Sequence, residues 1–369
     1  MDALHLTTAH KSTDTRIFDK EAKSLVNSGF DVGIVAHGAP EPSLDGVNFY
    51  SLGNADSRVE RWRSLYQIAR TAEDINPDIY HFHDPELLPV GVYLSNATSN
   101  AVIYDVHENY GHVASMREWI PIGVSNVLSR SIPSLEKAAA SQFDAIVTVA
   151  DWIGEPFAGV ADTIQTIHNF PRTQSLPSIE TGIESDSEYT LCFAGGLVGV
   201  RGIHQMLKLL RYLVADGVDV ELWALGSWMP DADRAKAEQF IKENNLEDYV
   251  TFPGYLNYEK MFQYLQSADV GLALLDTEHC KYSIPTKYFE YLYAGLPVVT
   301  TPISAADCYL PDEYKYVTPQ DDTEAAAEAV SKALDADCDI GSMQHVVEQK
   351  YSWEREAQKL IALYDELLD

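Results

Sequence analysis

Short apolar runs alternate with amphipathic stretches along the first half of the chain. The apolar runs have the length and the β-branched or aromatic content of buried strands, and they cover residues 4–8, 32–36, 79–82, 101–106, 145–149 and 163–168. Between them, apolar residues recur at helical spacing at residues 17–26, 60–74, 85–97 and 132–142. This alternation predicts a parallel sheet that is covered by helices on both faces.

The alternation stops at Pro171 and restarts at Thr190. The residues between them are polar, acidic and contain prolines, a composition typical of a linker. Beyond it, strands are predicted at residues 190–196, 220–226, 250–254, 269–275 and 297–301, and helices at 202–216, 231–244, 286–294 and 353–368. The predicted parts are an N-terminal domain (1–170), a linker (171–188), a second domain (189–350) and a last helical segment (351–369) that packs back toward the first domain.

Each domain is expected to be a Rossmann-like, doubly wound α/β sheet, whose ligands bind beyond the carboxyl ends of the strands. Two such domains facing each other would bind a ligand in the cleft between them. The length of 369 residues and a hydrophobic content of 46% support two buried cores. Because no run approaches the roughly 18 apolar residues of a membrane span, and the N-terminus does not resemble a secretion signal, we expect a cytoplasmic protein.

The charge balance is strongly acidic, with 26 basic and 56 acidic residues and a formal net charge of −30. Such a field repels nucleic acid and anionic lipid over most of the surface. The acidic residues are spread along the chain, which favours adaptation to a high-salt cytoplasm, as in a halophilic archaeon, over a disordered tail. The four cysteines have neither CxxC nor Cys/His spacing, so they indicate no zinc site and no disulfide framework.

The most informative segment is IPTKYFEYLYAGLPVV, residues 284–299. Pro285 suits the first turn of a helix and Gly295 suits its end. The unpaired N–H groups at that start form an anion site, and Lys287 adds a positive charge where a diphosphate could lie. Glu290, one turn later, can accept hydrogen bonds from sugar hydroxyls on the same side. An amphipathic helix with a solvated lysine and glutamate explains this segment equally well.

This segment resembles the donor-binding signature of glycosyltransferase family 4, retaining enzymes of the GT-B fold. Further segments match that family in order and spacing, at residues 193–207 (FAGGLVGVRGIHQML), 223–228, 250–274 and 352–364 in the second half and at 10–38, 78–89 (DIYHFHDPELLP) and 103–110 (IYDVHENY) in the first. The resemblance implies a GT-B fold of two Rossmann-like domains facing across a cleft. The N-terminal domain would bind the acceptor, and the C-terminal domain the nucleotide-sugar donor.

The resemblance implies roles for residues of the donor-binding domain. Glu290 would hold the donor ribose. Arg201 stands where the family has a phosphate-binding lysine, and together with Lys287 it would neutralise the leaving nucleotide. Backbone positions implied in donor binding are Gly195 and Gly196, for close approach, and Ile284, Pro285 and Thr286, for the diphosphate.

His107 matches the family histidine near the transferred sugar, although a single histidine after a strand is more often structural. The implied catalytic residues are His107, Arg201, Lys287 and Glu290. Glu108, the neighbour of His107 in the chain, is a candidate for contact with the acceptor or a phosphate.

The chain departs from the family pattern in two places. The first of two family glutamates would fall at Tyr282, which leaves the sugar contact open. The glycine-rich loop after the first strand is replaced by residues 13–16. There Asp14 suits a helix N-cap, and Arg16 is a candidate for contact with the acceptor or a phosphate.

The resemblance implies retaining transfer from a UDP- or GDP-sugar. Fixed positive charge would stabilise the leaving diphosphate, so we expect that no metal or organic cofactor is required. Residues 111–133 combine apolar side chains with isolated arginines. They suit either a peripheral membrane surface for a polyprenyl-phosphate-linked acceptor or a buried helix pair. A nucleotide-sugar 2-epimerase of the same fold and a catalytically silent nucleotide-sugar-binding subunit are the alternative functions.

Overall fold

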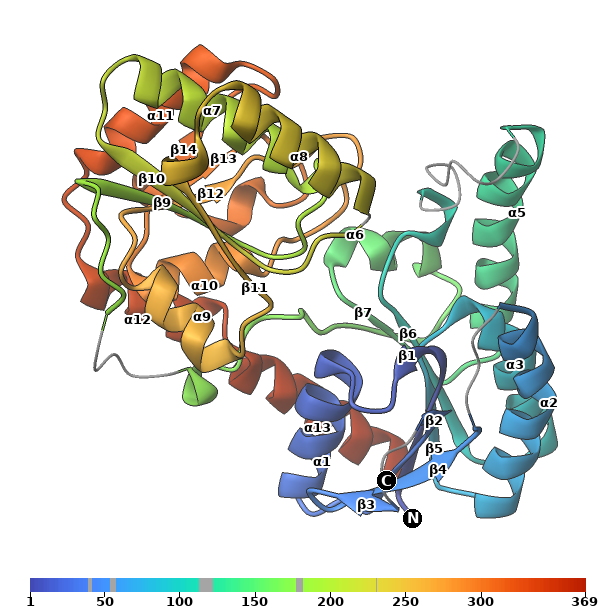
Figure 1. The fold of residues 1–369 in the computed structure, drawn as a ribbon. Coiled ribbons are helices and arrows are strands. Elements are labelled where there is room, and N and C mark those ends of the chain that lie inside the picture. The colour runs from blue at the N-terminus through green and yellow to red at the C-terminus, as the bar shows by residue number, and fades with distance from the viewer. Residues whose placement is uncertain (39–41, 54–57, 113–121, 177–181, 230) are drawn as a thin grey trace. The chain divides into compact units, whose positions relative to one another are not determined.

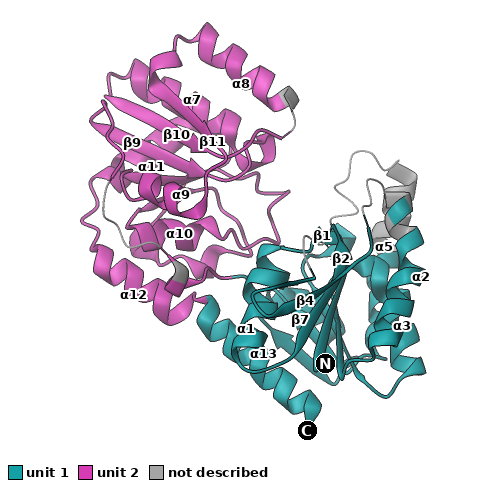
Figure 2. Cartoon of the chain, turned by 60° about the horizontal axis from the view of Figure 1, so that its bottom comes forward, with its two compact units in different colours: residues 1–169, 353–369 teal, residues 170–352 magenta. Residues whose placement is uncertain are grey.

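The computed structural model describes residues 1–38, 42–53, 58–112, 122–176, 182–229 and 231–369 (Figure 1). The chain forms two compact units (Figure 2). Unit 1 consists of Met1–Asn169 and Trp353–Asp369, and unit 2 consists of Phe170–Ser352. The predicted linker segment, as far as it is described, therefore belongs to unit 2, and the last helix belongs to unit 1. No described helix has the length and apolar character needed to cross a membrane.

Unit 1 is built on an eight-stranded sheet with the order β3-β4-β2-β1-β5-β6-β7-β8. Its strands are β1 (Ala3–Lys11), β2 (Val32–His37), β3 (Ser43–Leu44), β4 (Val47–Ser51), β5 (Ile79–Phe82), β6 (Ala101–Val106), β7 (Ala145–Thr148) and β8 (Thr163–Thr166). Only the β3–β4 pair is antiparallel among the described strands. The six apolar runs predicted as strands match β1, β2 and β5 to β8, whereas the edge strands β3 and β4 were not predicted.

Helices cover both faces of this sheet (Figure 1). The π-helix η1 (Thr15–Ala22), α1 (Lys23–Asn27) and α13 (Trp353–Leu368) pack on one face, where Phe18, Leu25 and Leu360 join its core. The opposite face carries α2 (Arg58–Ile75), α3 (Leu88–Ala97) and α5 (Ile122–Ala140), and the short α6 (Asp151–Gly154) follows β7. The last helix of the chain thus completes the core of the first unit.

Unit 2 is built on a six-stranded parallel sheet with the order β11-β10-β9-β12-β13-β14. Its strands are β9 (Tyr189–Ala194), β10 (Val220–Leu225), β11 (Val250–Gly254), β12 (Val270–Ala273), β13 (Val298–Thr300) and β14 (Lys315–Val317). One face carries α7 (Ile203–Ala215), α8 (Asp231–Glu243) and α11 (Thr323–Leu334), and the other carries α9 (Tyr258–Leu265), α10 (Lys287–Ala294) and α12 (Ile340–Lys350). The apolar stripe of α7, with Met206 and Leu210, is buried in the core of the first face.

The strand order reverses beside the first strand of each sheet. In unit 1, β1 lies between β2 and β5, and in unit 2, β9 lies between β10 and β12. At such a reversal the loops leave the two central strands in opposite directions and open a crevice at their carboxyl ends. These two edges are therefore where the fold favours ligand binding.

Gly202 holds α7 against the sheet of unit 2. It has a left-handed backbone (φ 87°), and a Cβ at this position would overlap the carbonyl oxygen of Leu274. Gly217 has a similar φ of 85°, but no atom lies within 4 Å of the place its Cβ would take. A side chain at Gly217 would cost only the free energy of a left-handed backbone, whereas one at Gly202 would also clash with Leu274.

We expect Gly202→Ala to lower the free energy of unfolding by at least about 3 kcal/mol, because the backbone of Leu274 or α7 must shift. The control, Gly217→Ala, should cost only about 1 kcal/mol, the price of a left-handed alanine. Urea unfolding of both variants measures the difference, and equal losses would contradict this account.

Candidate functional site

Two positively charged side chains meet beyond the carboxyl ends of β9 and β12 in unit 2. Arg201 ends the short 3-10 helix Gly199–Arg201 that follows β9, and Lys287 is the first residue of α10. A Cβ at Gly195 would lie 3.3 Å from Nζ of Lys287 and 3.6 Å from Nη1 of Arg201, and one at Gly196 would lie 3.1 Å from the same Nη1. The structure thus brings together these four predicted donor-binding residues, and the glycines leave room that side chains would fill.

Lys287 is buried although it carries a charge in its ordinary state. Its Nζ lies 4.1 Å from the ring centroid of Phe193. Burial, and then repulsion from Arg201, lower the pKa of Lys287 to about 7, an effect that attraction from Glu290 offsets only in part. Among the described residues, no carboxylate forms an ion pair with Lys287 or Arg201. Two adjacent basic side chains without a carboxylate ion-pair partner among the described residues suit a site for an anion.

The start of α10 adds backbone donors to this anion site. Ile284, Pro285 and Thr286 lead into the helix and are partly buried, and Thr286 is the N-cap residue. The first N–H groups of a helix carry a partial positive charge. In α10 those of Tyr288 and Phe289 already donate to the carbonyl oxygens of Pro285 and Thr286, which leaves the N–H groups ahead of them for a ligand. The predicted helix start is therefore placed next to the two cations, as phosphate binding requires.

Glu290 lies one turn into α10 and is partly buried. Its Oε1 accepts a hydrogen bond of 3.1 Å from the hydroxyl of Tyr258, the first residue of α9. This contact fixes one carboxylate oxygen in place, and it could not be predicted from the sequence because 32 residues separate the pair. Tyr282, at the position of the first family glutamate, is exposed.

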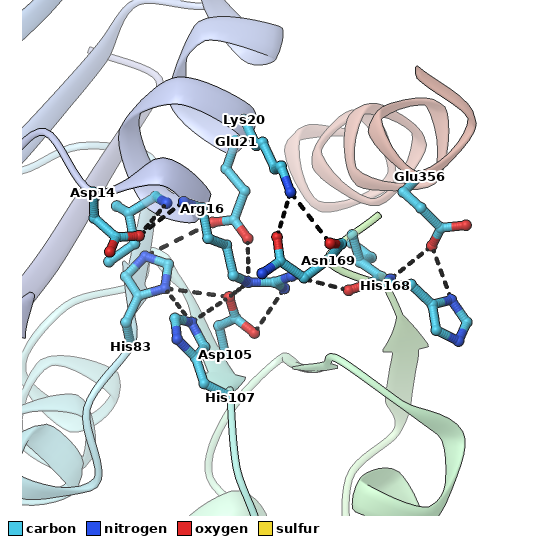
Figure 3. Close-up of polar contacts among 12 residues, drawn as sticks. Asp14, Arg16, Lys20, Glu21, His83, Asp105, His107, His168, Asn169 and Glu356 are labelled. Atoms are coloured by element: carbon cyan, nitrogen blue, oxygen red, sulfur yellow. Dashed lines mark hydrogen bonds and ion pairs between the residues drawn. The ribbon is translucent and has the colours of Figure 1, made fainter. Parts of the chain in front are cut away.

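A buried polar network occupies the corresponding edge of unit 1, at the carboxyl ends of β1, β5 and β6 (Figure 3). Asp105 of β6 is its centre. It accepts hydrogen bonds from Arg16 through Nε (3.1 Å) and Nη2 (3.2 Å), and its Oδ2 lies 3.0 Å from Nε2 of His107 and 3.2 Å from Nδ1 of His83. Although burial alone would raise the pKa of Asp105, Arg16 and His107 hold it well below its usual range.

The structure corrects the expectation for Arg16. Its side chain is buried, and its guanidinium contacts Asp105, Glu21 (2.9 Å) and the carbonyl oxygen of Ile167 (3.1 Å). It therefore orders the inside of unit 1 and is not available to an acceptor or a phosphate. Asp14 caps η1 as predicted, because its carboxylate accepts hydrogen bonds from the backbone N–H groups of Arg16 and Ile17.

His107 is partly buried, and its contact with Asp105 orients its ring. Nε2 faces the carboxylate, and the other ring nitrogen, Nδ1, has no hydrogen-bond partner among the described residues. Glu108 is exposed beside it. Unit 1 therefore places His107 and Glu108 at the edge of its sheet where the fold favours ligand binding, whereas Arg201, Lys287 and Glu290 belong to unit 2.

Several residues of the network in unit 1 were missed by sequence reasoning. Asp84 is buried and accepts hydrogen bonds from the backbone N–H groups of Thr8 and Ala9, which fixes the end of β1. His10 approaches Asp84 (3.5 Å) and its ring lies 5.0 Å from that of His107. The signal available in the sequence was the unusual placing of histidines in and after a strand, in the segment IYHFHD.

The predicted acceptor segment, residues 111–133, lies largely outside the described residues. Met116, Arg117, Trp119 and Ile120 are not described. Residues 122–133 belong to α5, but the side chains of 122–130 are not described, among them Ile122, Val124, Val127, Leu128 and Arg130.

Two family models match the chain. Residues 188–336 match the family described as "Glycosyl transferases group 1", and residues 16–174 match the family described as "Glycosyltransferase Family 4". Together these matches span most of both units. No curated protein matches the sequence significantly.

Solved structures of similar fold span the whole chain. A sucrose-phosphate synthase from Thermosynechococcus elongatus has a TM-score of 0.77 at 16% identity, covering 100% of this chain and 99% of that one. A glycosyltransferase from Rickettsia africae has a TM-score of 0.74 at 14% identity, covering 100% and 98%. The Anabaena protein HepE in complex with UDP has a TM-score of 0.75 at 13% identity, covering 99% and 100%. The likeness confirms the predicted two-domain α/β architecture of the GT-B type.

The lowered pKa of Lys287 predicts a pH-dependent stability. In the folded, ligand-free protein the ammonium is lost near pH 7, whereas in the unfolded chain it persists to about pH 10.5. Its burial therefore destabilises the fold fully below pH 7, and this cost shrinks as the pH rises toward 10.

We expect Lys287→Met to raise the melting temperature by about 4 °C or more at pH 6 and by little at pH 10. Lys332→Met, at an exposed lysine of α11, serves as the control and should show no such trend. Thermal unfolding of both variants between pH 6 and 10 tests this, and a pH-independent gain at Lys287 would contradict it.

Proposed function

Because the chain belongs to the glycosyltransferases of the group 1 and family 4 type, we propose that it moves a sugar from a nucleotide-sugar donor to a hydroxyl group of a glycan or lipid-linked acceptor. The observation that carries this proposal is the Arg201–Lys287 pair, two cations without a carboxylate partner in the described residues, beside the N-terminus of α10. A diphosphate has the charge and the oxygen atoms to satisfy all three.

The donor that we propose is a UDP- or GDP-sugar bound by unit 2. Arg201 and Lys287 contact the diphosphate, and the backbone at Ile284, Pro285 and Thr286 receives it, with hydrogen bonds donated by the N–H groups of Ile284 and Thr286. Glu290, held by Tyr258, accepts hydrogen bonds from the ribose hydroxyls. The similar protein HepE was solved with UDP and with UDP-glucose, which supports a donor of this class.

The reaction that we propose retains the configuration of the sugar. The bond between the anomeric carbon and the phosphate oxygen breaks, the acceptor hydroxyl bonds to the same face, and its proton leaves with the diphosphate. Arg201, Lys287 and the start of α10 stabilise the charge that develops on the leaving group. These fixed charges take the role that a divalent ion has in other transferases, so we expect transfer without added metal or organic cofactor.

Unit 1 is the proposed acceptor-binding part. Its ligand-binding edge carries His107, oriented by Asp105, and the exposed Glu108. A hydroxyl acceptor on a glycan or a polyprenyl phosphate fits assembly of cell-surface polysaccharide or of protein-linked glycans. We therefore place the enzyme in the cytoplasm, in peripheral contact with the inner face of the membrane when the acceptor is lipid-linked.

One experiment separates this proposal from its rivals. Purified protein is incubated at high salt with a panel of radiolabelled UDP- and GDP-sugars and membrane lipids, with and without EDTA. We expect label to move to a lipid or glycan in both conditions. Isomerised sugar without transfer would show an epimerase, and donor binding without turnover would show a silent subunit.

Arg201→Ala is expected to lower turnover with the donor so identified by about a hundredfold or more, because the leaving phosphate loses a charged donor. The control is Arg211→Ala, at an exposed arginine of α7 in the same unit. Both variants should have the melting temperature of the parent protein. Unchanged turnover in Arg201→Ala would remove Arg201 from the site.

A further inference from the structure

We propose that unit 1 contains a structural metal site in which His5, His81, His83 and Glu21 bind one divalent transition-metal ion, with Zn²⁺ as the best fit. His5 lies on β1, His81 on β5 and His83 just beyond it, and Glu21 lies on η1. All four side chains are fully buried. The site is distinct from the donor site in unit 2, and it does not depend on the proposed transfer reaction.

The register of the sheet explains why these residues meet. His5 of β1 pairs directly with His81 of the parallel strand β5. His83 follows two residues later, so its side chain is on the same face of the sheet as that of His81. The π-helix η1 packs on this face and supplies Glu21. Residues 78 positions apart thereby form one cluster.

The distances suit a small divalent ion. Nδ1 of His5 lies 2.9 Å from Nε2 of His83, and Oε2 of Glu21 lies 3.9 Å from each of them. A point equidistant from these three atoms is about 2.1 Å from each, the length of a Zn–N or Zn–O bond. His81 completes the group, whose ligand atoms all lie within 4.8 Å of one another. Two imidazole nitrogens at 2.9 Å would separate slightly to reach tetrahedral geometry.

The ring nitrogens that face away from the cluster have polar partners. Nδ1 of His83 lies 3.2 Å from Oδ2 of Asp105, and Nδ1 of His81 lies 2.8 Å from the hydroxyl of Tyr364 on α13. The same hydroxyl lies 3.4 Å from Nε2 of His5. Metal-binding histidines commonly hydrogen-bond a carboxylate or another oxygen through the second nitrogen, which orients the ring and leaves the first nitrogen free for the metal.

Two of the atoms that point into the cluster lack such partners. Oε2 of Glu21 and Nε2 of His81 are buried and have no hydrogen-bond partner among the described residues, whereas Oε1 of Glu21 pairs with Nε of Arg16 (2.9 Å) and Nδ1 of His5 pairs with Nε2 of His83. Leaving buried polar atoms unpaired is costly. A bound metal ion would satisfy the carboxylate and the imidazole at once.

Charge balance also favours a cation here. Glu21 and Asp105 are fully buried, and among the described residues that contact them only Arg16 has a fixed positive charge. One negative charge is therefore left over in the interior. A proton is the competing way to remove it, since burial raises the pKa of Glu21 well above its usual range. A divalent ion instead keeps Glu21 ionised and uses the three imidazoles, ligands that Zn²⁺ favours.

The test measures metal content directly. The full chain is unfolded with a chelator, then refolded at high salt with or without equimolar Zn²⁺, and bound metal is determined after dialysis by elemental analysis. We expect about one Zn²⁺ per chain and a higher melting temperature than that of the metal-free sample. Refolding with Co²⁺ should give the visible absorption of a tetrahedral nitrogen and oxygen site.

Glu21→Gln removes the charged ligand while keeping its shape. We expect this variant to retain at least tenfold less Zn²⁺ than the parent after dialysis. His204→Gln, at a half-exposed histidine paired with Asp233 in unit 2, is the control and should bind as much as the parent. Less than about 0.1 Zn²⁺ per chain in the refolded parent overturns the proposal, whether or not Glu21→Gln folds. Full occupancy in a folded Glu21→Gln also overturns the assignment of Glu21 as a ligand.

Discussion

Arg201 and Lys287 of unit 2 repel each other when both are charged, because no carboxylate among the described residues forms an ion pair with either of them. The repulsion and the burial of Lys287 show in its pKa of about 7. The fold maintains the pair because Lys287 is fixed by the start of α10, and Arg201 is fixed by the turn after β9. Since the chain carries a net charge of −30, carboxylates for neutralising the pair were abundant. In the part of the chain that the structure describes, none of them forms an ion pair with Arg201 or Lys287, which suits a site for a negatively charged ligand.

Both units place their candidate functional side chains where the strand order reverses, but the side chains of the two units differ in charge. In unit 2 the strand reversal beside β9 gathers cations, glycines and a helix start. In unit 1 the reversal beside β1 gathers histidines and carboxylates around a buried arginine. Positive charge suits the diphosphate of a donor. A rigid network that orients His107 suits a neutral hydroxyl or sugar, whose recognition depends on hydrogen-bond direction rather than on charge.

The features that could be predicted from the sequence are those formed by residues that are close together in the chain. Buried strands were visible as apolar runs, and the proposed donor site could be suggested because its helix start and Lys287 are neighbours in the chain. The short β3 and β14 carry few apolar residues and were not predicted. The role of Arg16 was missed because its partner Asp105 is 89 residues away. The histidine cluster was missed for the same reason, since only the register of β1 and β5 brings His5 to His81.

The acidic surface and an anion site are compatible because they act over different distances. Repulsion between a diphosphate and scattered carboxylates acts through solvent, and at 1 M salt its range falls to about 3 Å. The proposed contacts with Arg201, Lys287 and the start of α10 would form at hydrogen-bond distance, and Lys287 is buried, so salt would screen them much less. Salt therefore weakens the repulsion more than the attraction. A chain with this composition can bind a phosphorylated ligand best where the salt concentration is high.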